Sequence, residues 1–310
     1  MPVCLGLDTS NYTTSAAVFD GAGGRNCGKL LKVPEGALGL RQSDALFQHV
    51  KRLPDIFAAL RQEGVLKDLT AVGASTRPRA VEGSYMPCFL PGETVGRCLA
   101  DALGVPFFSC AHQEGHLAAA AWSAGRLDLL DQPHLAWHLS GGTTELLYVQ
   151  PQGSGINAIC VGGTSDISAG QLIDRTGKLL NLDFPSGKAL DALTEGCDLG
   201  QYYRVKLKDL TFSLSGVENQ VKAFVERGEK PQYVACYVLD TVAGAVQTTT
   251  QVAWKKWPGL PVLCSGGVAS SRRLRRWLNS AVFAAPEYST DNAMGVSILT
   301  HRMLLQEGRA

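Results

Sequence analysis

The sequence predicts an α/β protein made of two similar lobes, because one strand–turn–strand pattern occurs twice. Residues Val3–Asp20 and His134–Gln150 each combine an apolar strand, a small polar turn with hydroxyl groups, and a second β-rich strand. Each pattern is typical of a β-hairpin. The repetition indicates a duplicated lobe, with a ligand cleft expected between the two copies. We expect residues 1–105 and 292–310 to form one lobe and residues 106–291 the other.

Three segments outside these hairpins have the apolar periodicity of helices. The first is Ser43–Gln62, with Ser43 in a suitable place for the N-cap. Pro54 lies inside this segment and is expected to kink or split the helix. The other two expected helices are Gly92–Leu103 and Tyr233–Lys255.

Composition restricts the class of protein. The chain has 310 residues, a hydrophobic fraction of 45% and a net charge of +1, as expected for a globular protein. Its nine cysteines are odd in number and include no CxxC pair, which argues against a disulfide framework or a zinc knot. Reduced thiols in the cytoplasm fit best. We expect neither a signal peptide nor a membrane helix, because Asp8 interrupts the early apolar run and no apolar stretch reaches about 18 residues.

A third glycine turn and a long loop complete the organisation. In "LPVLCSGGVASSRRLRRWL" an apolar strand leads through Gly266 and Gly267 into a basic helix. A strand, glycine turn and helix in this order can present backbone N–H groups and a helix N-terminus to a phosphate. Residues 76–91 contain three prolines and two arginines, which predicts an irregular loop of the length that tends to be functional or disordered.

The run "HQEGH" places His112 and His116 four residues apart. On a helix, residues with this spacing lie on the same face, so the two imidazoles can share one metal ion. Glu114 lies two residues from either histidine, on the opposite side of the helix. This argues against a zinc protease, whose "HExxH" glutamate serves as general base beside the metal. Two unrelated surface histidines remain the simpler alternative.

These motifs together resemble the tRNA N6-adenosine threonylcarbamoyltransferase family, the universal threonylcarbamoyladenosine synthases formerly described as O-sialoglycoprotein endopeptidase or peptidase M22. The resemblance extends almost from end to end and rests on "LGLDTS", "ETVGRCLADALGVPFFSCAHQEGHLAAA", "LSGGTTELLYV", "AGQLIDRTGKLLNLDFPSGKALDAL", "FSLSGVENQV", "SGGVASSRRLRR" and "YSTDNAMG". It implies the actin-like ATPase (ASKHA) fold, in which two RNase H-like lobes surround a nucleotide cleft.

The resemblance also implies a site and a reaction. His112, His116 and Asp291 would hold one divalent metal, iron or zinc, although Asp291 would also suit the cap of a helix. Threonylcarbamoyl-AMP, or another adenine nucleotide, would be the substrate. Asp8 and Asn11 in the first turn are expected to be catalytic. The expected substrate-binding residues are Leu139, Ser140, Gly141, Gly142, Thr143, Asp174, Gly187, Asp191, Gly266, Gly267 and Ser271.

The chain departs from the family pattern in four places. Asn11 and Tyr12 stand where the family has an acidic pair, Thr143 replaces a histidine, and Ser271 replaces an asparagine. The loop at residues 76–91 replaces a glycine-rich loop. These changes indicate a divergent paralogue. It would transfer threonylcarbamoyl to tRNA, bind nucleotides in a regulatory or scaffolding role, or act as another small-molecule carbamoyl or phosphoryl transferase. A kinase or ATPase of the same fold and, last, a metalloprotease are further alternatives.

The expected partners are tRNA and accessory proteins of the threonylcarbamoyladenosine pathway, with no membrane. Binding to an anticodon loop requires a basic surface, since phosphate contacts supply much of the affinity. Arg77 and Arg79 in the long loop are the preferred candidates. A second cluster follows Gly267, where solvent-exposed arginines of a helix are the simpler explanation: Arg272, Arg273, Arg275 and Arg276.

Overall fold

The computed structural model describes residues 1–10, 12–33, 40–81, 83–197 and 202–308. It divides into two compact units. Unit 1 comprises Met1–Gln132, Gln150–Ala158 and Thr290–Ala310, and unit 2 comprises Pro133–Val149 and Ile159–Ser289. None of the described helices is both long and apolar enough to cross a membrane.

Unit 1 contains a five-stranded sheet in the order β3-β2-β1-β4-β5. The first three strands are antiparallel neighbours, whereas β4 and β5 continue the sheet in parallel. The strands are β1 (Val3–Asp8), β2 (Thr13–Phe19), β3 (Gly24–Leu30), β4 (Leu69–Arg77) and β5 (Phe107–Ala111). The helical segments are α1 (Gln42–Gln62), η1 (Pro87–Phe89), α2 (Leu90–Leu103), α3 (His112–Ser123), η2 (Leu127–Asp131) and α9 (Met294–Gln306).

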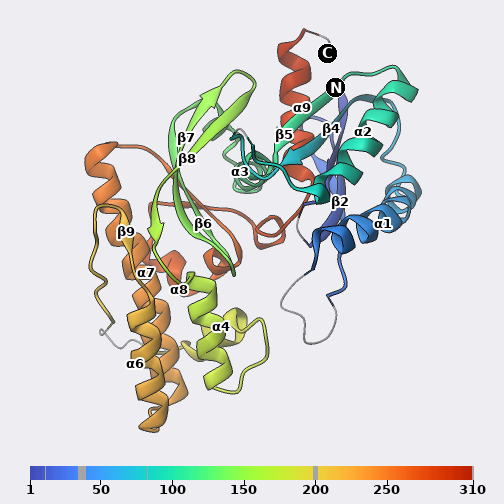
Figure 1. The fold of residues 1–310 in the computed structure, drawn as a ribbon. Coiled ribbons are helices and arrows are strands. Elements are labelled where there is room, and N and C mark those ends of the chain that lie inside the picture. The colour runs from blue at the N-terminus through green and yellow to red at the C-terminus, as the bar shows by residue number, and fades with distance from the viewer. Residues whose placement is uncertain (11, 34–39, 82, 198–201, 309–310) are drawn as a thin grey trace. The chain divides into compact units, whose positions relative to one another are not determined.

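Helices cover both faces of this sheet (Figure 1). Leu5 and Leu7 of β1 face one side, where they join a core with buried residues of α1 and α2. Gly6, between them, faces α9, and a Cβ on Gly6 would come within 2.4 Å of the Ser297 backbone nitrogen. Alternation along β1 therefore leaves room for α9 to pack directly on the strand.

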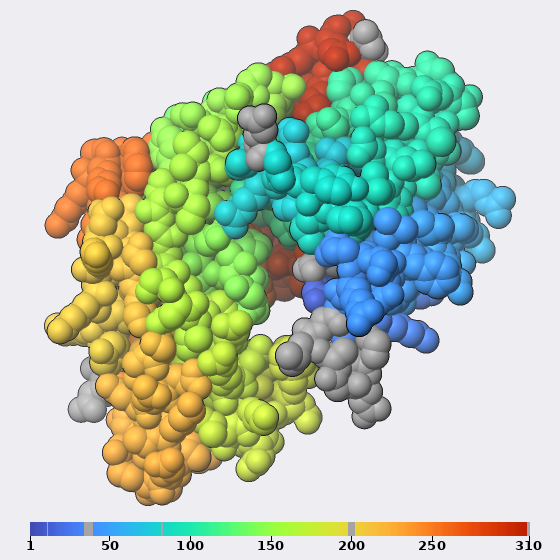
Figure 2. All heavy atoms as spheres, viewed as in Figure 1, coloured from blue at the N-terminus to red at the C-terminus, as the bar shows by residue number. Residues whose placement is uncertain are grey.

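Unit 2 contains a six-stranded sheet in the order β11-β10-β6-β7-β8-β9. Its strands are β6 (His134–Leu139), β7 (Thr144–Gln152), β8 (Gly155–Thr164), β9 (Thr211–Phe212), β10 (Val262–Ser265) and β11 (Val282–Phe283). The end of β7 and the start of β8, within residues 150–158, group with unit 1. Its helical segments are α4 (Ala169–Leu179), α5 (Gly187–Leu193), α6 (Ser215–Glu226), α7 (Pro231–Lys256), η3 (Gly267–Ser270), α8 (Arg272–Trp277) and η4 (Pro286–Tyr288). In Figure 2 the atoms of α4 and α6 form one continuous surface.

The two sheets repeat one connectivity, which confirms the predicted pair of hairpins. Strands β1, β2 and β3 correspond in order to β6, β7 and β8, while β4 and β5 correspond to β10 and β11. Strands β1 and β2 form an antiparallel hairpin, as do β6 and β7. Strand β4 pairs in parallel with β1, and β10 pairs in parallel with β6. Unit 2 differs by the added edge strand β9.

The boundary between the units differs from the one expected. Residues 106–132 group with unit 1, whereas the expected boundary after residue 105 assigned them to the other lobe. The physical reason is the packing of α3 on α9. Gly115 and Gly295 bring these helices so close that a Cβ on Gly295 would lie 1.7 Å from the Gly115 carbonyl oxygen.

The expected helices are present, with two corrections in α1. The helix is continuous from Gln42 to Gln62, so of the two outcomes predicted at Pro54, a kink or a split, the split is wrong. Pro54 is exposed, and water can hydrogen-bond the backbone carbonyl that its ring leaves without a donor. Ser43 lies inside the helix and is not the N-cap, which is Arg41.

The loop expected at residues 76–91 is shorter. Strand β4 extends to Arg77, and η1 begins at Pro87. The fixed φ of Pro87 suits the first position of a helical turn. The irregular segment is therefore confined to residues 78–86, of which residue 82 lies outside the described part of the chain.

Candidate metal and nucleotide sites

The strand-to-helix junction at Ala111 positions the histidine pair. Strand β5 ends at Ala111 and α3 begins at His112 without an intervening loop. The Glu114 carboxylate accepts a hydrogen bond from the Ala111 N–H at 2.6 Å and so satisfies a donor at the helix start. As expected from helical spacing, His112 and His116 lie on one face, with ring centroids 4.2 Å apart.

Asp291 reaches the histidines from the segment that precedes α9. The N-cap of α9 is Ala293, and the Asn292 side chain accepts a hydrogen bond from the Met294 N–H at 3.1 Å. The alternative of Asp291 as the helix cap is therefore not what the structure shows. The close crossing at Gly115 and Gly295 fixes the start of α9 beside α3, and the Asp291 carboxylate faces the two imidazoles.

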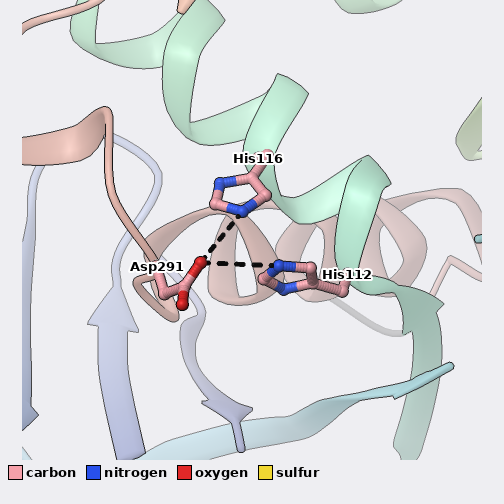
Figure 3. A group of neighbouring side chains, drawn as sticks. All are labelled: His112, His116 and Asp291. Carbon is pink, nitrogen blue, oxygen red and sulfur yellow. Dashed lines mark ion pairs between the residues drawn. The ribbon is translucent and has the colours of Figure 1, made fainter. Parts of the chain in front are cut away.

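The three side chains converge on one point within unit 1 (Figure 3). One Asp291 oxygen, Oδ1, lies 3.3 Å from His116 Nε2 and 3.6 Å from His112 Nε2. One ligand atom from each residue lies within 4.8 Å of the other two. Each side chain is partly exposed, at 17% for His112, 14% for His116 and 19% for Asp291, so a small ligand can reach the group.

Asp8 at the end of β1 controls the charge of His112. Its Oδ2 lies 2.7 Å from His112 Nδ1, and the carboxylate is only 1% exposed. Burial alone would lower the pKa of His112. The charge and hydrogen bond of Asp8, with the charge of Asp291, outweigh burial and raise that pKa to about 9. Conversely, burial would raise the pKa of Asp8, but His112 and a hydrogen bond from Ser10 hold it below its usual value.

The donor set suits a divalent transition metal. Two imidazoles and a carboxylate are ligands that zinc and iron accept, and three protein ligands leave positions open for a substrate. Bonds of about 2.0–2.2 Å to a tetrahedral ion place ligand atoms roughly 3.3–3.6 Å apart. The two Asp291 separations match this spacing. The Glu114 carboxylate is hydrogen-bonded to the Ala111 N–H, so the expectation that it faces away from the histidines is confirmed.

A separate pocket of about 730 Å³ lies within unit 2. This volume is in the range typical of small-molecule sites. Six of the expected substrate-binding residues line it: Gly141, Asp174, Gly187, Asp191, Gly267 and Ser271. The lining residues that the sequence analysis missed include Lys188, Ser270 and Arg272. Lys188 follows Gly187, and Ser270 and Arg272 flank Ser271, so adjacency in the sequence was the available signal.

The two aspartates of this pocket differ in their bonding. Asp174 accepts the Ser186 N–H at 2.8 Å through Oδ1. Asp191, 9% exposed, accepts the Ser271 hydroxyl at 2.6 Å and the Arg272 guanidinium at 3.1 Å. Burial would raise the pKa of Asp191, but these bonds hold it below its usual value.

Asp191 also corrects the prediction of a phosphate at the helix that follows Gly267. The glycine turn leads into the short η3, and α8 begins only at Arg272. The N–H groups of Arg272 and Arg273 at its start lie 3.3 and 3.4 Å from the Asp191 oxygens. The anion expected at this helix N-terminus is therefore an internal carboxylate.

The other expected substrate-binding residues do not line the pocket. Leu139 is fully buried in the core of unit 2, and Thr143 closes the turn by donating its N–H to Ser140 Oγ at 3.0 Å. Gly266, at φ +94°, lies where a Cβ would come within 2.2 Å of the Leu139 carbonyl oxygen. Glycine is required there by packing. Gly142 lies in the same turn as Thr143. Asn11 lies outside the described residues.

Most of the arginines after Gly267 donate hydrogen bonds to carboxylates or backbone carbonyl oxygens of unit 2. Arg273 is 7% exposed and forms a two-pronged ion pair with Asp240, at 2.5 and 2.6 Å. Arg275 donates to the Ala269 and Ala284 carbonyl oxygens, both at 3.1 Å. The simpler explanation of solvent-exposed arginines is therefore wrong for Arg273. In unit 1, Arg77 and Arg79 are both exposed.

Comparisons with solved structures identify the fold. Full-length HypF in a phosphate- and nucleotide-bound form gives a TM-score of 0.61 at 12% identity, covering 98% of this chain and 46% of that one. The activator of 2-hydroxyisocaproyl-CoA dehydratase from Clostridium difficile gives 0.53 at 13%, covering 99% and 97%. A ROK hexokinase from Thermus thermophilus gives 0.52 at 14%, covering 98% and 99%. The chain thus spans about half of HypF, and the expected ASKHA fold is confirmed.

The sequence also matches a family profile described as TsaD, tRNA N6-adenosine threonylcarbamoyltransferase. The match covers residues 39–297, which is most of the chain. It includes His112, His116 and Asp291, as well as the pocket of unit 2. The chain belongs to the TsaD family of tRNA N6-adenosine threonylcarbamoyltransferases.

Proposed function

We propose that this protein transfers the threonylcarbamoyl group of threonylcarbamoyl-AMP to the N6 amine of the adenosine next to the anticodon of tRNA. The N6 nitrogen forms a bond to the carbamoyl carbon. The bond from that carbon to the AMP phosphate oxygen breaks, AMP leaves, and the N6 proton passes to solvent. The proposal extends family membership to a specific reaction of this chain.

The observation that carries the proposal is the convergence of His112, His116 and Asp291 in a TsaD-family chain. Two residues one helical turn apart and a third from a distant part of the sequence bring their ligand atoms within 4.8 Å. We assign a divalent metal, iron or zinc, to these three residues. When bound, such an ion supplies Lewis-acid polarisation of carbonyl or phosphate oxygens.

The protein's own groups bind and position the substrate. In the proposal, the nucleotide part occupies the pocket of unit 2, where Asp174 accepts hydrogen bonds from ribose hydroxyls. Gly141, Gly187 and Gly267 line the same pocket, and their lack of a side chain permits close approach of backbone N–H groups to a ligand. Positioning of this kind accounts for much of the rate increase in transfer between two bound substrates.

The proposed partners are tRNA and accessory proteins of the same pathway, and the proposed location is the cytoplasm. Exposed Arg77 and Arg79 remain the preferred tRNA contacts. Charge reversal of both should weaken tRNA binding and reduce the salt dependence by about one unit per lost phosphate contact. Because Arg276 is also exposed, Arg276→Glu tests the second cluster separately.

The deciding experiment supplies threonylcarbamoyl-AMP and a tRNA that reads codons beginning with A. Digestion of the tRNA and mass spectrometry of its nucleosides should reveal threonylcarbamoyladenosine with the wild-type protein. His116→Ala, which removes one of the three proposed metal ligands, should give much less product. Absence of product with wild type, in the presence of zinc or iron(II) and of a cell extract that supplies accessory proteins, would contradict the proposal.

One alternative has an observation in its favour. Asp191, an expected ribose ligand, is already bonded to Ser271 and Arg272, and Ser271 is one of the positions that departs from the family pattern. These departures from the family pattern favour a paralogue with a regulatory or scaffolding role, which would bind its nucleotide through Asp174 and not through Asp191. Such a protein would bind AMP, by calorimetry, yet leave the tRNA unmodified in the same assay.

A further inference from the structure

We infer that Asp8, held in place by Ser10, is the residue that orients His112 as a metal ligand. Asp8 is thus a positioning residue, where the sequence had suggested a catalytic one. The inference rests on the proposed function, because it concerns the ring that would hold the metal. It adds Ser10 to the residues on which the site depends.

The end of β1 presents its side chains alternately to two sides. The Thr9 hydroxyl accepts the Gly92 N–H at 3.1 Å, at the start of α2. Asp8 and Ser10, on either side of Thr9, both turn toward His112. Strand β1 ends at Asp8, and the Ser10 N–H bonds to the Asp8 side chain two residues before it, as in an Asx turn. The sequence "DTS" therefore brings the pair together locally.

The two carboxylate oxygens of Asp8 have separate partners. Oδ1 accepts the Ser10 N–H at 2.7 Å and also the Ser10 hydroxyl. Oδ2 lies 2.7 Å from His112 Nδ1. With 1% of its surface exposed, Asp8 cannot contact a substrate. Its direct contact with the proposed metal ligands is the one with His112.

The arrangement determines which ring nitrogen of His112 is available. An ionised carboxylate only accepts hydrogen bonds, so Nδ1 must carry a proton where it meets Asp8. In the neutral ring Nε2 is then the nitrogen with a lone pair, and it is the one that faces Asp291, at 3.6 Å. Carboxylates that hold a metal-binding histidine in this way fix its tautomer and orientation and increase its basicity.

The same three residues do not form a nucleophilic triad. In such a triad the hydroxyl and the carboxylate bind opposite nitrogens of the histidine. Here Ser10 Oγ lies 2.9 Å from Nδ1, the nitrogen that Asp8 also contacts, and 3.4 Å from Nε2. The Ser10 hydroxyl donates to Asp8, and the imidazole nitrogen nearest to it, Nδ1, carries a proton in this arrangement, so the ring offers Ser10 no lone pair there. Ser10 therefore holds Asp8 and does not act as a nucleophile.

The test compares metal affinity among matched variants. Cobalt(II), followed by its absorption spectrum, and zinc, followed by calorimetry, are titrated into metal-stripped protein. Asp8→Asn should bind each ion about 10–100-fold more weakly than wild type. Ser10→Ala, which removes one hydrogen bond to Asp8, should weaken binding roughly 2–10-fold. Glu114→Gln is the control, because this carboxylate faces away from the histidines and glutamine can still accept the Ala111 N–H.

A second readout does not depend on metal. Nitrogen-15 NMR of the histidine side chains at pH 10, where the neutral ring is present, should show His112 protonated at Nδ1 in wild type. In Asp8→Asn the proton should move largely to Nε2. Should Asp8→Asn fail to fold, Ser10→Ala serves for both measurements, with a partial shift expected.

The outcomes separate this inference from the proposed function. Unchanged metal affinity together with unchanged protonation of His112 in the variants would overturn the inference. A wild-type protein that binds neither ion would contradict the proposed metal centre. In that case a shift of the His112 proton in Asp8→Asn would still support the positioning by Asp8, and no shift would overturn it.

Discussion

A Cβ atom on Gly295 would lie 1.7 Å from the carbonyl oxygen of Gly115, so these two glycines are the point where α9 crosses α3. Gly115 belongs to the "HQEGH" run and separates Glu114 from His116. Gly295 follows Asp291 by four residues. The contact that joins the helices thus also sets the position of the carboxylate relative to the two imidazoles.

Gly295→Ala should therefore reduce both stability and metal affinity. The methyl group would meet backbone atoms, which cannot rotate away, and overpacking of this kind costs about 1–3 kcal/mol. Urea denaturation measures the free energy of unfolding, and cobalt titration measures the affinity. Gly216→Ala is the matched control, because Gly216 is also the second residue of its helix and has no neighbour within 4 Å of an added Cβ. Equal stability of the two variants would contradict the role of the crossing.

Removal of metal should destabilise the wild-type protein. An ion that binds only the folded state contributes about 2.7 kcal/mol when present at 100 times its dissociation constant. A chelator should therefore lower the thermal unfolding midpoint of zinc-loaded wild type and leave that of Asp291→Ala unchanged. Asp101→Asn, an exposed substitution in the same unit, should respond as wild type does. A chelator response in Asp291→Ala equal to that of wild type would exclude Asp291 as a ligand.

His301 should make the stability of the protein depend on pH. This residue of α9 is 8% exposed and meets the Phe19 ring edge-on, with centroids 5.3 Å apart. Burial lowers the pKa of His301, and the charge of Asp20 opposes this only in part. In the unfolded chain the pKa is about 6.5. The neutral ring therefore contributes stability above pH 6.5, and this contribution is lost as the pH falls from 6.5 through the lower pKa of the folded state.

The measurement is the free energy of unfolding in urea between pH 7.5 and pH 5.5. The wild-type value should fall more steeply than that of His301→Phe, whose ring can keep the Phe19 contact but cannot be protonated. Parallel curves for the two proteins would show that His301 does not cause the dependence.

The sequence predicted the repeated fold and the common face of the two histidines because both depend on local patterns. Two similar hairpins predicted two sheets of the same connectivity, and the spacing of His112 and His116 predicted their common face. Asp291 is different, since it lies far away in the chain. Its place beside the histidines was implied by the family resemblance alone.

Long-range packing could not be predicted in the same way. The domain boundary depends on the contact of Gly115 with Gly295, 180 residues apart, and no periodicity records it. Pro54 remains within α1 because that face of the helix is exposed, which a local rule for proline does not consider. The Asp191 carboxylate accepts hydrogen bonds from Ser271 and Arg272, which are distant from it in the sequence.

Asp174 and Asp191 should respond differently to the same substitution, although the family resemblance implied the same role for both. Asp174→Asn keeps an oxygen for the Ser186 N–H and replaces the other acceptor with a donor. It should weaken AMP binding about 10–100-fold, as expected for hydrogen bonds to a charged group, while the free energy of unfolding changes little. Asp191→Asn removes the anion from the start of α8 and should lower the free energy of unfolding by about 1–3 kcal/mol.

Calorimetry with AMP and urea denaturation of both variants measure the two effects. The control is Asp183→Asn, because Asp183 is an exposed aspartate between α4 and α5. A loss of AMP affinity in Asp191→Asn without a loss of stability would instead make Asp191 the ribose ligand, and the present assignment of Asp174 would be wrong.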